Sequence, residues 1–169
     1  MANNHLKKED LLAKFKEWEI ESETVDHPEV FTVEAMMPYL ERLSGAMCKN
    51  LFLKDKKKRL YLLAALFDRE VKLSDVGKKV GATGGLRLAD ESILEEKLGV
   101  KQGCVTAYAL VNDVNKDVKL LVDDDIINGK YDKVWFHPLD NAATTGVTCD
   151  DFLKFLQKTG HEPVSVKFE

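Results

Sequence analysis

The hydrophobic residues near the start of the chain follow a helical period. Leu11, Leu12, Phe15 and Trp18 recur at intervals of three and four residues, which places them on one side of an amphipathic helix. An apolar stripe of this kind is stable only when another element covers it. The sequence therefore predicts an opening helix that packs on a sheet.

The most strand-like pattern lies in the first half of the chain. Residues 47–53 and 59–67 are two apolar runs, and the polar tract Lys-Asp-Lys-Lys-Lys at residues 54–58 separates them. A short polar tract between two apolar runs is typical of the connection in a β-hairpin. We therefore expect the two runs to pair as antiparallel strands.

Further apolar runs have the length of strands, at residues 105–111, 118–122, 133–136 and 164–168. Several strands follow one another without an intervening helix, which favours a mixed, largely antiparallel sheet over a doubly wound parallel one. The 44% hydrophobic content is enough for one core at a length of 169 residues. The predicted fold class is mixed α/β, with helices flanking the sheet, in a single domain over residues 1–169.

Residues that cap helix N-termini mark the further helices that we expect, at Thr32, Ser74, Asp90 and Thr148. The first of these runs to about Leu43, and Pro38 bends or divides it. Gly99 follows Leu98 and suits the end of the helix that Asp90 begins. The helix after Thr148 carries apolar residues at Phe152, Phe155 and Leu156.

Charge and cysteine content narrow the function. A net charge of −4 argues against broad coating of nucleic acid, which depends on many Lys and Arg side chains, but it allows a local basic patch. Cys48, Cys104 and Cys149 are far apart and lack CxxC spacing, so we expect reduced thiols. The first residues lack the apolar core of a signal peptide, and no stretch approaches the roughly 18 apolar residues of a membrane span. We therefore expect a cytoplasmic protein without a membrane partner.

The common catalytic signatures do not occur in the sequence. It contains no GxSxG elbow and no HExxH, and its glycines lack the order of a phosphate-binding P-loop. The acidic run at residues 123–125 is contiguous, and such a triplet rarely supplies the converging oxygens that a hard cation needs. His5, His27 and His161 have no partner at ligand spacing, so we expect surface or turn positions. The sequence predicts neither a metal nor a cofactor.

Four short segments form a specific combination through their order and spacing. They are Cys48-Lys49-Asn50-Leu51-Phe52-Leu53-Lys54-Asp55, Gly84-Gly85-Leu86-Arg87-Leu88-Ala89, Gly103-Cys104-Val105-Thr106 with Val111-Asn112-Asp113, and His137-Pro138-Leu139 with Asn141 and Thr144-Thr145. Together they resemble the YbaK/prolyl-tRNA synthetase-associated domain family over about residues 11–168. The opening helix, residues 25–28 and residues 49–53 resemble its stand-alone alanine-editing branch more than its cysteine-specific branch.

The resemblance implies a trans-editing deacylase that hydrolyses alanine from mischarged tRNA for proline. It implies a mixed sheet with one cleft, no cofactor, a monomer, and prolyl-tRNA synthetase as a further partner. Two alternatives stay open at this point. The enzyme could instead remove cysteine or another small amino acid, or the chain could be a non-catalytic module that binds tRNA or a synthetase.

The resemblance also assigns roles to residues. Lys49 is the essential lysine, which would hold the terminal phosphate or polarise the ester, although a strand lysine could also simply face solvent. Lys54 and Arg87 would contact tRNA, whereas the lysines at the hairpin tip could form either a tRNA patch or a solvated turn. The expected substrate-binding residues are Asn50, Gly103, Cys104, Val105, Thr106, Ala107, His137 and Thr145.

One position departs from the family pattern. The family loop resembles Gly-x-x-x-Pro, and here it runs from Gly103 to Ala107, so the terminal proline is missing. Proline fixes φ, so its loss could loosen the loop, while glycine still lets the backbone come close to a ligand. We expect the loop to act through its backbone amides, and Cys104 to contribute its backbone rather than a nucleophilic thiol.

Overall fold

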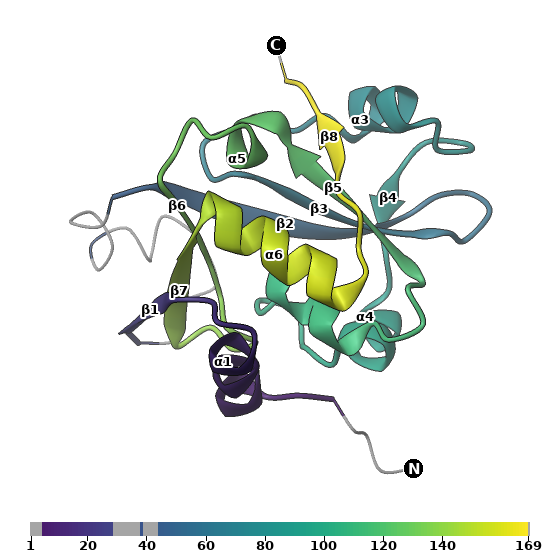
Figure 1. The fold of residues 1–169 in the computed structure, drawn as a ribbon. Helices are drawn as coiled ribbons and strands as arrows, with labels where there is room; N and C mark the ends of the chain where they lie inside the picture. The colour runs from purple at the N-terminus through teal and green to yellow at the C-terminus, as the bar shows by residue number, and fades with distance from the viewer. Residues whose placement is uncertain (1–4, 29–37, 39–43, 169) are drawn as a thin grey trace.

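A mixed β-sheet runs through the protein and carries helices on both faces (Figure 1). We describe it from a computed structural model, which covers residues 5–28, 38 and 44–168. The strands are β1 (Ser22–Asp26), β2 (Ala46–Lys54), β3 (Leu60–Leu66), β4 (Arg87–Leu88), β5 (Val118–Asp123), β6 (Lys133–Phe136), β7 (Ala143–Thr148) and β8 (Val164–Val166). The helices are α1 (Lys8–Glu17), α3 (Leu73–Val80), α4 (Glu91–Leu98), the 3-10 helix η1 (Ala107–Asn112), α5 (Asp124–Ile127) and α6 (Cys149–Thr159).

The strand order is β1-β7-β6-β2-β3-β5-β8, and the short β4 pairs with β2 beside this path. β2 and β3 form the predicted antiparallel hairpin, in which Lys54 lies opposite Leu60. The pairs β1–β7, β6–β7 and β2–β4 are also antiparallel, whereas β2–β6, β3–β5 and β5–β8 are parallel. The predicted mixed fold class is confirmed.

Side chains of β2 alternate between two hydrophobic clusters. Cys48 and Phe52 belong to the larger cluster, which α1, α4, η1 and α6 cover, while Leu51 and Leu53 pack with the smaller cluster beneath α3. Successive side chains of a strand point to opposite faces. Lys49 is therefore on the α3 face of the sheet at the point where its neighbour Asn50 is on the α4 face. Figure 1 shows α6 crossing one face of the sheet and α3 lying beside β8.

Several predicted helix ends are confirmed. Thr148 caps α6, because its hydroxyl accepts a hydrogen bond from Asp151 N, and Gly99 ends α4 with a φ of 70°. Asp90 occupies the N-cap position of α4, although its side chain makes no capping bond. The prediction for α3 was two residues late, since Lys72 and not Ser74 precedes its first turn.

The expectation of a strand at residues 105–111 was wrong. Thr106 is the N-cap of η1, where its hydroxyl accepts from Tyr108 N, and four of the five apolar residues that follow are buried. A short, fully apolar run looks the same in a buried helix and in a buried strand, so periodicity could not separate them. The predicted helix from Thr32 to Leu43 lies outside the described residues, except for Pro38.

Two of the histidines expected at surface or turn positions lie outside helices and strands but are buried. His27 Nε2 is hydrogen-bonded to Thr144 Oγ1 at 2.8 Å, and His161 Nε2 lies 2.9 Å from Asp113 Oδ2. Both partners are distant in sequence, and local spacing therefore gave no sign of them. Among the helices of the described residues, none has the length and apolar character needed to cross a membrane.

Candidate active site

A cleft of about 340 Å³ opens at one edge of β2. Along this edge β2 pairs with β6 at Ala46 and Met47, and with β4 at Leu53 and Lys54. In the part of the chain that the structure describes, no strand pairs with residues 48–52 on this edge. The cleft is lined by residues 48–52 of β2, by Leu88, Ala89, Glu91 and Leu94 around the start of α4, by Gln102, Gly103 and Val105 before η1, and by His137 after β6.

The backbone of Asn50 points to the open edge. Phe52 O accepts a hydrogen bond from Ala89 N on this side, whereas Met47 O accepts one from Phe67 N on the β3 side. Because the backbone groups of successive residues in a strand point to opposite edges, the N–H and C=O of Asn50 share the direction of Phe52. The cleft is thus walled partly by peptide groups that are available to a ligand.

The side chain of Asn50 places a buried hydrogen-bond acceptor at the cleft. Its Oδ1 atom is buried and has no hydrogen-bond partner among the described residues. A buried acceptor without a partner costs about 1–3 kcal/mol, so such groups are uncommon in folded proteins. Asn50 lines the cleft, where an N–H or O–H donor of a bound molecule could satisfy this oxygen.

Lys49 brings a positive charge to the same edge. It borders the cleft, and its Nζ donates a hydrogen bond to Arg69 O at 2.5 Å. Within the described residues no carboxylate lies within ion-pair distance of this ammonium. An ammonium has three donors, so two remain after the bond to Arg69. The local geometry leaves a cation that is oriented but not neutralised.

His137 is a neutral imidazole at this site. Burial lowers its pKa below the usual value for histidine, and the nearby His27, whose ring lies 6.3 Å away, adds to this effect. Its Nδ1 lies 3.0 Å from Ala143 O, and a carbonyl can only accept, so Nδ1 carries the hydrogen. The other ring nitrogen, Nε2, is then a hydrogen-bond acceptor at neutral pH.

The thiols are poorly suited to nucleophilic attack. Cys48 lines the cleft, but burial raises the pKa of its thiol far above the usual range, so that the thiol stays protonated. Cys104 borders a different hollow, with Lys101 and Leu139. The structure thus keeps the cleft free of a reactive thiolate.

The predicted substrate-binding residues divide into two groups. Asn50, Gly103, Val105 and His137 line the cleft, and Gly103 has a φ of 92°, which glycine adopts most readily. The remaining predictions, Cys104, Thr106, Ala107 and Thr145, do not line it. Thr106 and Ala107 are fully buried at the start of η1, and the hydroxyl of the fully buried Thr145 is bonded to that of Thr24.

Eight residues that line the cleft were not among the predicted site residues: Cys48, Leu51, Phe52, Leu88, Ala89, Glu91, Leu94 and Gln102. Leu88 is 63% exposed, which is unusual for a large apolar side chain beside a cleft. It belongs to a strand of only two residues, and so short an element leaves no periodic signal in a sequence.

The turn between β2 and β3 carries the exposed Lys56, Lys57 and Lys58, and we call it the basic turn. Two further basic residues lie on the adjoining strands, beside the cleft. Lys54 Nζ lies 3.6 Å from Asp90 Oδ2, and Arg87, opposite Lys54 in the β2–β4 pair, is exposed. The turn between β2 and β3 packs closely on the loop before β4. A Cβ atom added to Gly84 in this loop would lie only 2.6 Å from Lys56 Cβ. The expected tRNA-binding residues therefore lie together beside the cleft.

The acidic run at residues 123–125 is engaged in protein contacts. Asp123 and Asp125 both form ion pairs with Arg69, and Asp124 accepts a hydrogen bond from Ser165 Oγ. Among the described residues there is no group of three or more His, Cys, Asp or Glu side chains that could hold a metal ion.

Comparison with known proteins places the chain in a family. A family model described as the aminoacyl-tRNA editing domain matches residues 27–155, a segment that contains every residue lining the cleft. The chain belongs to the aminoacyl-tRNA editing domain family. The resemblance read from the four sequence segments is thereby confirmed.

Editing-domain relatives match over nearly the full length of the chain. "Prolyl-tRNA synthetase associated domain-containing protein 1" of Xenopus laevis is 49% identical, over 96% of this chain and 97% of the relative. The protein of the same name from Mus musculus is 50% identical, over 89% of each chain. "Prolyl-tRNA editing protein ProX" of Acetoanaerobium sticklandii is 30% identical, over 91% of this chain and 93% of that protein.

Solved structures support the fold of this editing-domain protein. The crystal structure of hypothetical protein APE2540 superposes with a TM-score of 0.71 at 18% identity, covering 92% of this chain and 97% of that chain. A structure described as a proposed trans-editing enzyme for prolyl tRNA synthetase also gives 0.71, at 19% identity, over 96% of this chain and 97% of that chain. The mixed sheet with its flanking helices is therefore shared.

Proposed function

We propose that this protein is a trans-editing deacylase that hydrolyses alanine from mischarged tRNA for proline. The observation that carries this proposal is the combination, at the open edge of β2, of a buried Asn50 Oδ1 and a Lys49 ammonium that have, respectively, no hydrogen-bond partner and no carboxylate within ion-pair distance among the described residues. An aminoacylated tRNA end offers what both groups lack. It has N–H and O–H donors for the amide oxygen and a phosphate or ester oxygen for the cation.

The chemistry requires little from the protein beyond positioning. An aminoacyl ester is already activated, so a held water, donors for the developing oxyanion and a clamp on the terminal nucleotide are sufficient. Lys49 would bind the terminal phosphate or stabilise the oxyanion, and the backbone around Gly103 would supply amide donors. His137, neutral and with Nε2 as an acceptor, would take a proton from the attacking water. No protein nucleophile is needed, which agrees with the protonated Cys48 thiol.

The names of the relatives support tRNA for proline as the substrate class, because they refer to prolyl-tRNA synthetase or to prolyl-tRNA editing. A synthetase pocket made for proline rejects smaller alanine weakly, since missing methylenes weaken binding by only about 1–3 kcal/mol. A second site that is too small for the proline ring would then remove the error. The cleft volume lies near the lower end of the usual range for ligand sites, about 300–1,000 Å³.

The basic turn supports the binding of the acceptor stem. Lys54 and Arg87 lie beside the cleft, and Lys56, Lys57 and Lys58 are exposed at the hairpin tip. Phosphate contacts from such side chains would orient the tRNA without reading its sequence. We propose that a single cytoplasmic domain acts as a monomer on tRNA released by prolyl-tRNA synthetase.

Single-turnover deacylation of Ala-, Ser-, Cys- and Pro-tRNA, all on the tRNA for proline and at matched enzyme excess, tests the proposal. We expect alanine to be hydrolysed fastest, serine next and proline slowest. Serine has nearly the volume of alanine, so only an unpaired hydroxyl against an apolar wall would slow it. Proline hydrolysis as fast as that of alanine would contradict the size sieve. Cysteine as the fastest substrate would favour the cysteine-specific alternative, and tRNA binding without any deacylation would favour a non-catalytic module.

A further inference from the structure

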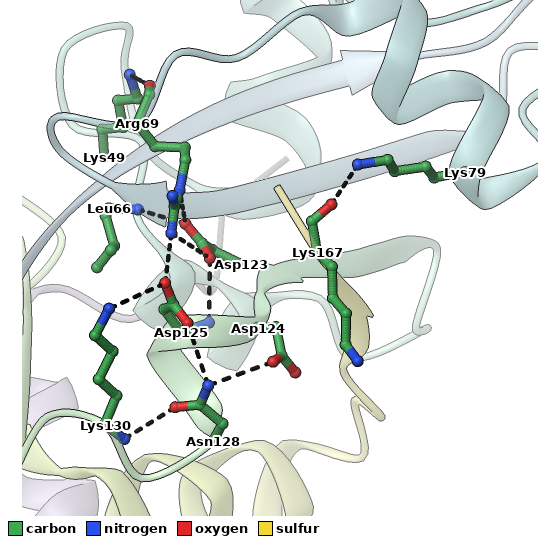
Figure 2. A network of polar contacts seen from close by, with 10 residues as sticks. All are labelled: Lys49, Leu66, Arg69, Lys79, Asp123, Asp124, Asp125, Asn128, Lys130 and Lys167. Carbon is green, nitrogen blue, oxygen red and sulfur yellow. Dashed lines mark hydrogen bonds and ion pairs between the residues drawn. The ribbon is translucent and has the colours of Figure 1, made fainter. Parts of the chain in front are cut away.

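Arg69 contacts Lys49 through its backbone and the acidic run through its side chain. Its backbone carbonyl accepts the hydrogen bond from Lys49 Nζ at 2.5 Å, while its guanidinium extends to the acidic run at the end of β5. Figure 2 shows Arg69 between Lys49 on one side and the carboxylates of Asp123 and Asp125 on the other. Arg69 lies between β3 and α3, outside any helix or strand.

The guanidinium is clamped by two carboxylates. Nε lies 2.9 Å from Asp123 Oδ2, and Nη2 lies 3.3 Å from Asp123 Oδ1 and 2.6 Å from Asp125 Oδ2. A bidentate pair of this kind fixes the plane and direction of an arginine more closely than a single contact would. The hydrogen bond from Arg69 also lowers the pKa of Asp125, which keeps this carboxylate ionised.

The partner carboxylate is itself fixed in the fold. The Asp123 side chain is 1% exposed, its Oδ2 also accepts from Leu66 N, and its Oδ1 accepts from Asp125 N. Leu66 is the last residue of β3, so Asp123 joins the end of β3 to the end of β5. The turn that carries the Arg69 carbonyl is thus tied to the sheet through a side chain 54 residues away.

The Lys49 ammonium needs such an anchor. Its four-carbon stem is flexible, and strand alternation places it on the opposite face of β2 from Asn50. A fixed acceptor just after the end of β3 would hold the ammonium beside the cleft and leave two donors for a ligand. Without it, the ammonium could occupy many positions in solvent.

We propose that Arg69 is the positioning residue for Lys49: the clamp of Asp123 and Asp125 on its guanidinium fixes its carbonyl, which holds the Lys49 ammonium at the edge of the cleft. This inference rests on the proposed deacylase function. It assigns a role in catalysis to a residue that does not line the cleft.

The test compares Arg69→Gln with Lys130→Gln as a matched control. Lys130 joins the same network only at its outer side, 3.6 Å from Asp125 Oδ2, and its side chain is 57% exposed. The measurements are the single-turnover deacylation rate of Ala-tRNA at saturating enzyme, the Kd for the tRNA, and the ¹⁵Nζ resonance of Lys49. We expect Arg69→Gln to slow deacylation about 10-fold to 100-fold, because small misplacements of a catalytic group have effects of this size.

The Kd should stay within about twofold, since phosphate contacts elsewhere dominate tRNA affinity. The Lys49 resonance should shift in Arg69→Gln and stay in place in Lys130→Gln. Arg69→Lys keeps a cation but not the bidentate fork, so we expect it to restore part of the rate. A merely structural role would lower the melting temperature without moving the resonance.

Removal of Arg69 alone leaves the buried Asp123 without its cation, which could unfold the protein. The double variant Arg69→Met with Asp123→Asn removes both charges, and we expect it to fold and to be as slow as Arg69→Gln. An unchanged rate in a folded variant, or a slow rate with an unmoved Lys49 resonance, would overturn the inference. The proposed function fails separately, if the wild-type protein does not hydrolyse Ala-tRNA.

Discussion

Two polar side chains on the β2–β3 hairpin have opposite environments. The Asp55 carboxylate is fully buried, and four donors reach it: Lys57 N and Arg59 N bond to Oδ1, while Arg59 Nε and Tyr61 Oη bond to Oδ2. Asn50 lies five residues earlier in the same hairpin. Its buried Oδ1 has no partner among the described residues.

The contrast separates a structural part of the hairpin, at its turn, from the part to which we assign substrate binding. Burial alone would raise the pKa of Asp55, but the hydrogen bonds from Arg59 and Tyr61 outweigh it and lower the pKa to about 2. Asp55 therefore stabilises the turn as a satisfied anion. A buried acceptor without a partner lowers stability and persists where a ligand can satisfy it. The hairpin thus carries a basic turn at its tip and an open edge along the middle of β2.

The largest effect should come from Lys49→Ala at the open edge. We expect the deacylation rate to fall by about 100-fold or more, because the variant removes a charge that stabilises the transition state. The melting temperature should change little, since the ammonium makes a single hydrogen bond within the part of the chain that the structure describes. Single-turnover kinetics and thermal unfolding measure the two quantities, with Lys56→Ala at the turn as control. A rate near that of the wild type would remove Lys49 from the mechanism.

Asn50→Ala and Asp55→Ala test the comparison directly. Asn50→Ala should slow deacylation by about tenfold, the equivalent of one hydrogen bond to the substrate, and leave the melting temperature unchanged or higher. Asp55→Ala should lower the melting temperature clearly, because four donors lose their acceptor, and change the rate at saturating enzyme by less than about twofold.

These two variants are measured by the same kinetic and unfolding assays at a temperature where both proteins are folded. If Asn50→Ala destabilised the protein and Asp55→Ala did not, the roles assigned to Asn50 in binding and to Asp55 in stability would be wrong.

The sequence was sufficient to predict those helices and strands whose deciding contacts are between residues close together in the chain. The β2–β3 hairpin was predicted because two apolar runs flank a polar tract, and the cap of α6 because Thr148 precedes an amphipathic helix. The 3-10 helix η1 was missed because five of its six residues are buried, which leaves no alternation of apolar and polar positions. The two-residue strand β4, which forms one wall of the cleft, is too short for a pattern.

The site was predictable only through its motif. Lys49 and Asn50 were identified from the resemblance, yet nothing in the sequence indicated that Asn50 Oδ1 would lack a partner or that Arg69 O would bind the ammonium. The Arg69–Asp123 pair joins residues far apart in the chain, as does the pair of Asp113 with His161. Such contacts follow from the strand order, which a single sequence does not reveal.

The cleft and the turn of the hairpin should also respond to pH in different ranges. Burial lowers the pKa of His137, so lowering the pH protonates it only below its usual value of about 6.5. Deacylation should fall with pH in that range, because protonated Nε2 cannot accept a proton. His137→Gln should be slow at all pH values and lose this dependence. An acid limb that is the same in His137→Gln and in the wild type would exclude His137 as the proton acceptor.

Asp55 should affect stability at lower pH. Its pKa is about 2 in the folded protein and about 3.9 when unfolded, so the unfolded state binds more protons between these values. The stability that Asp55 contributes is therefore present above about pH 4 and is lost as the pH falls towards 2. Asp55→Asn should show a weaker pH dependence of the melting temperature in this window. An equal dependence in both proteins would show that Asp55 is not the group responsible.

The smallest effect should come from the surface of the basic turn. Lys56, Lys57 and Lys58 are exposed, and their joint replacement by Gln should weaken tRNA binding severalfold while leaving the rate at saturating enzyme unchanged. Each phosphate contact that is lost should reduce the slope of log K against log salt by about one. The matched control replaces the exposed Lys16, Lys119 and Lys158, which changes the net charge equally but lies on α1, β5 and α6. Binding titrations at several salt concentrations measure both triple variants. A turn that contacts the acceptor stem gives a smaller salt slope only in the first variant, whereas equal slopes would mean that these lysines act merely through overall charge.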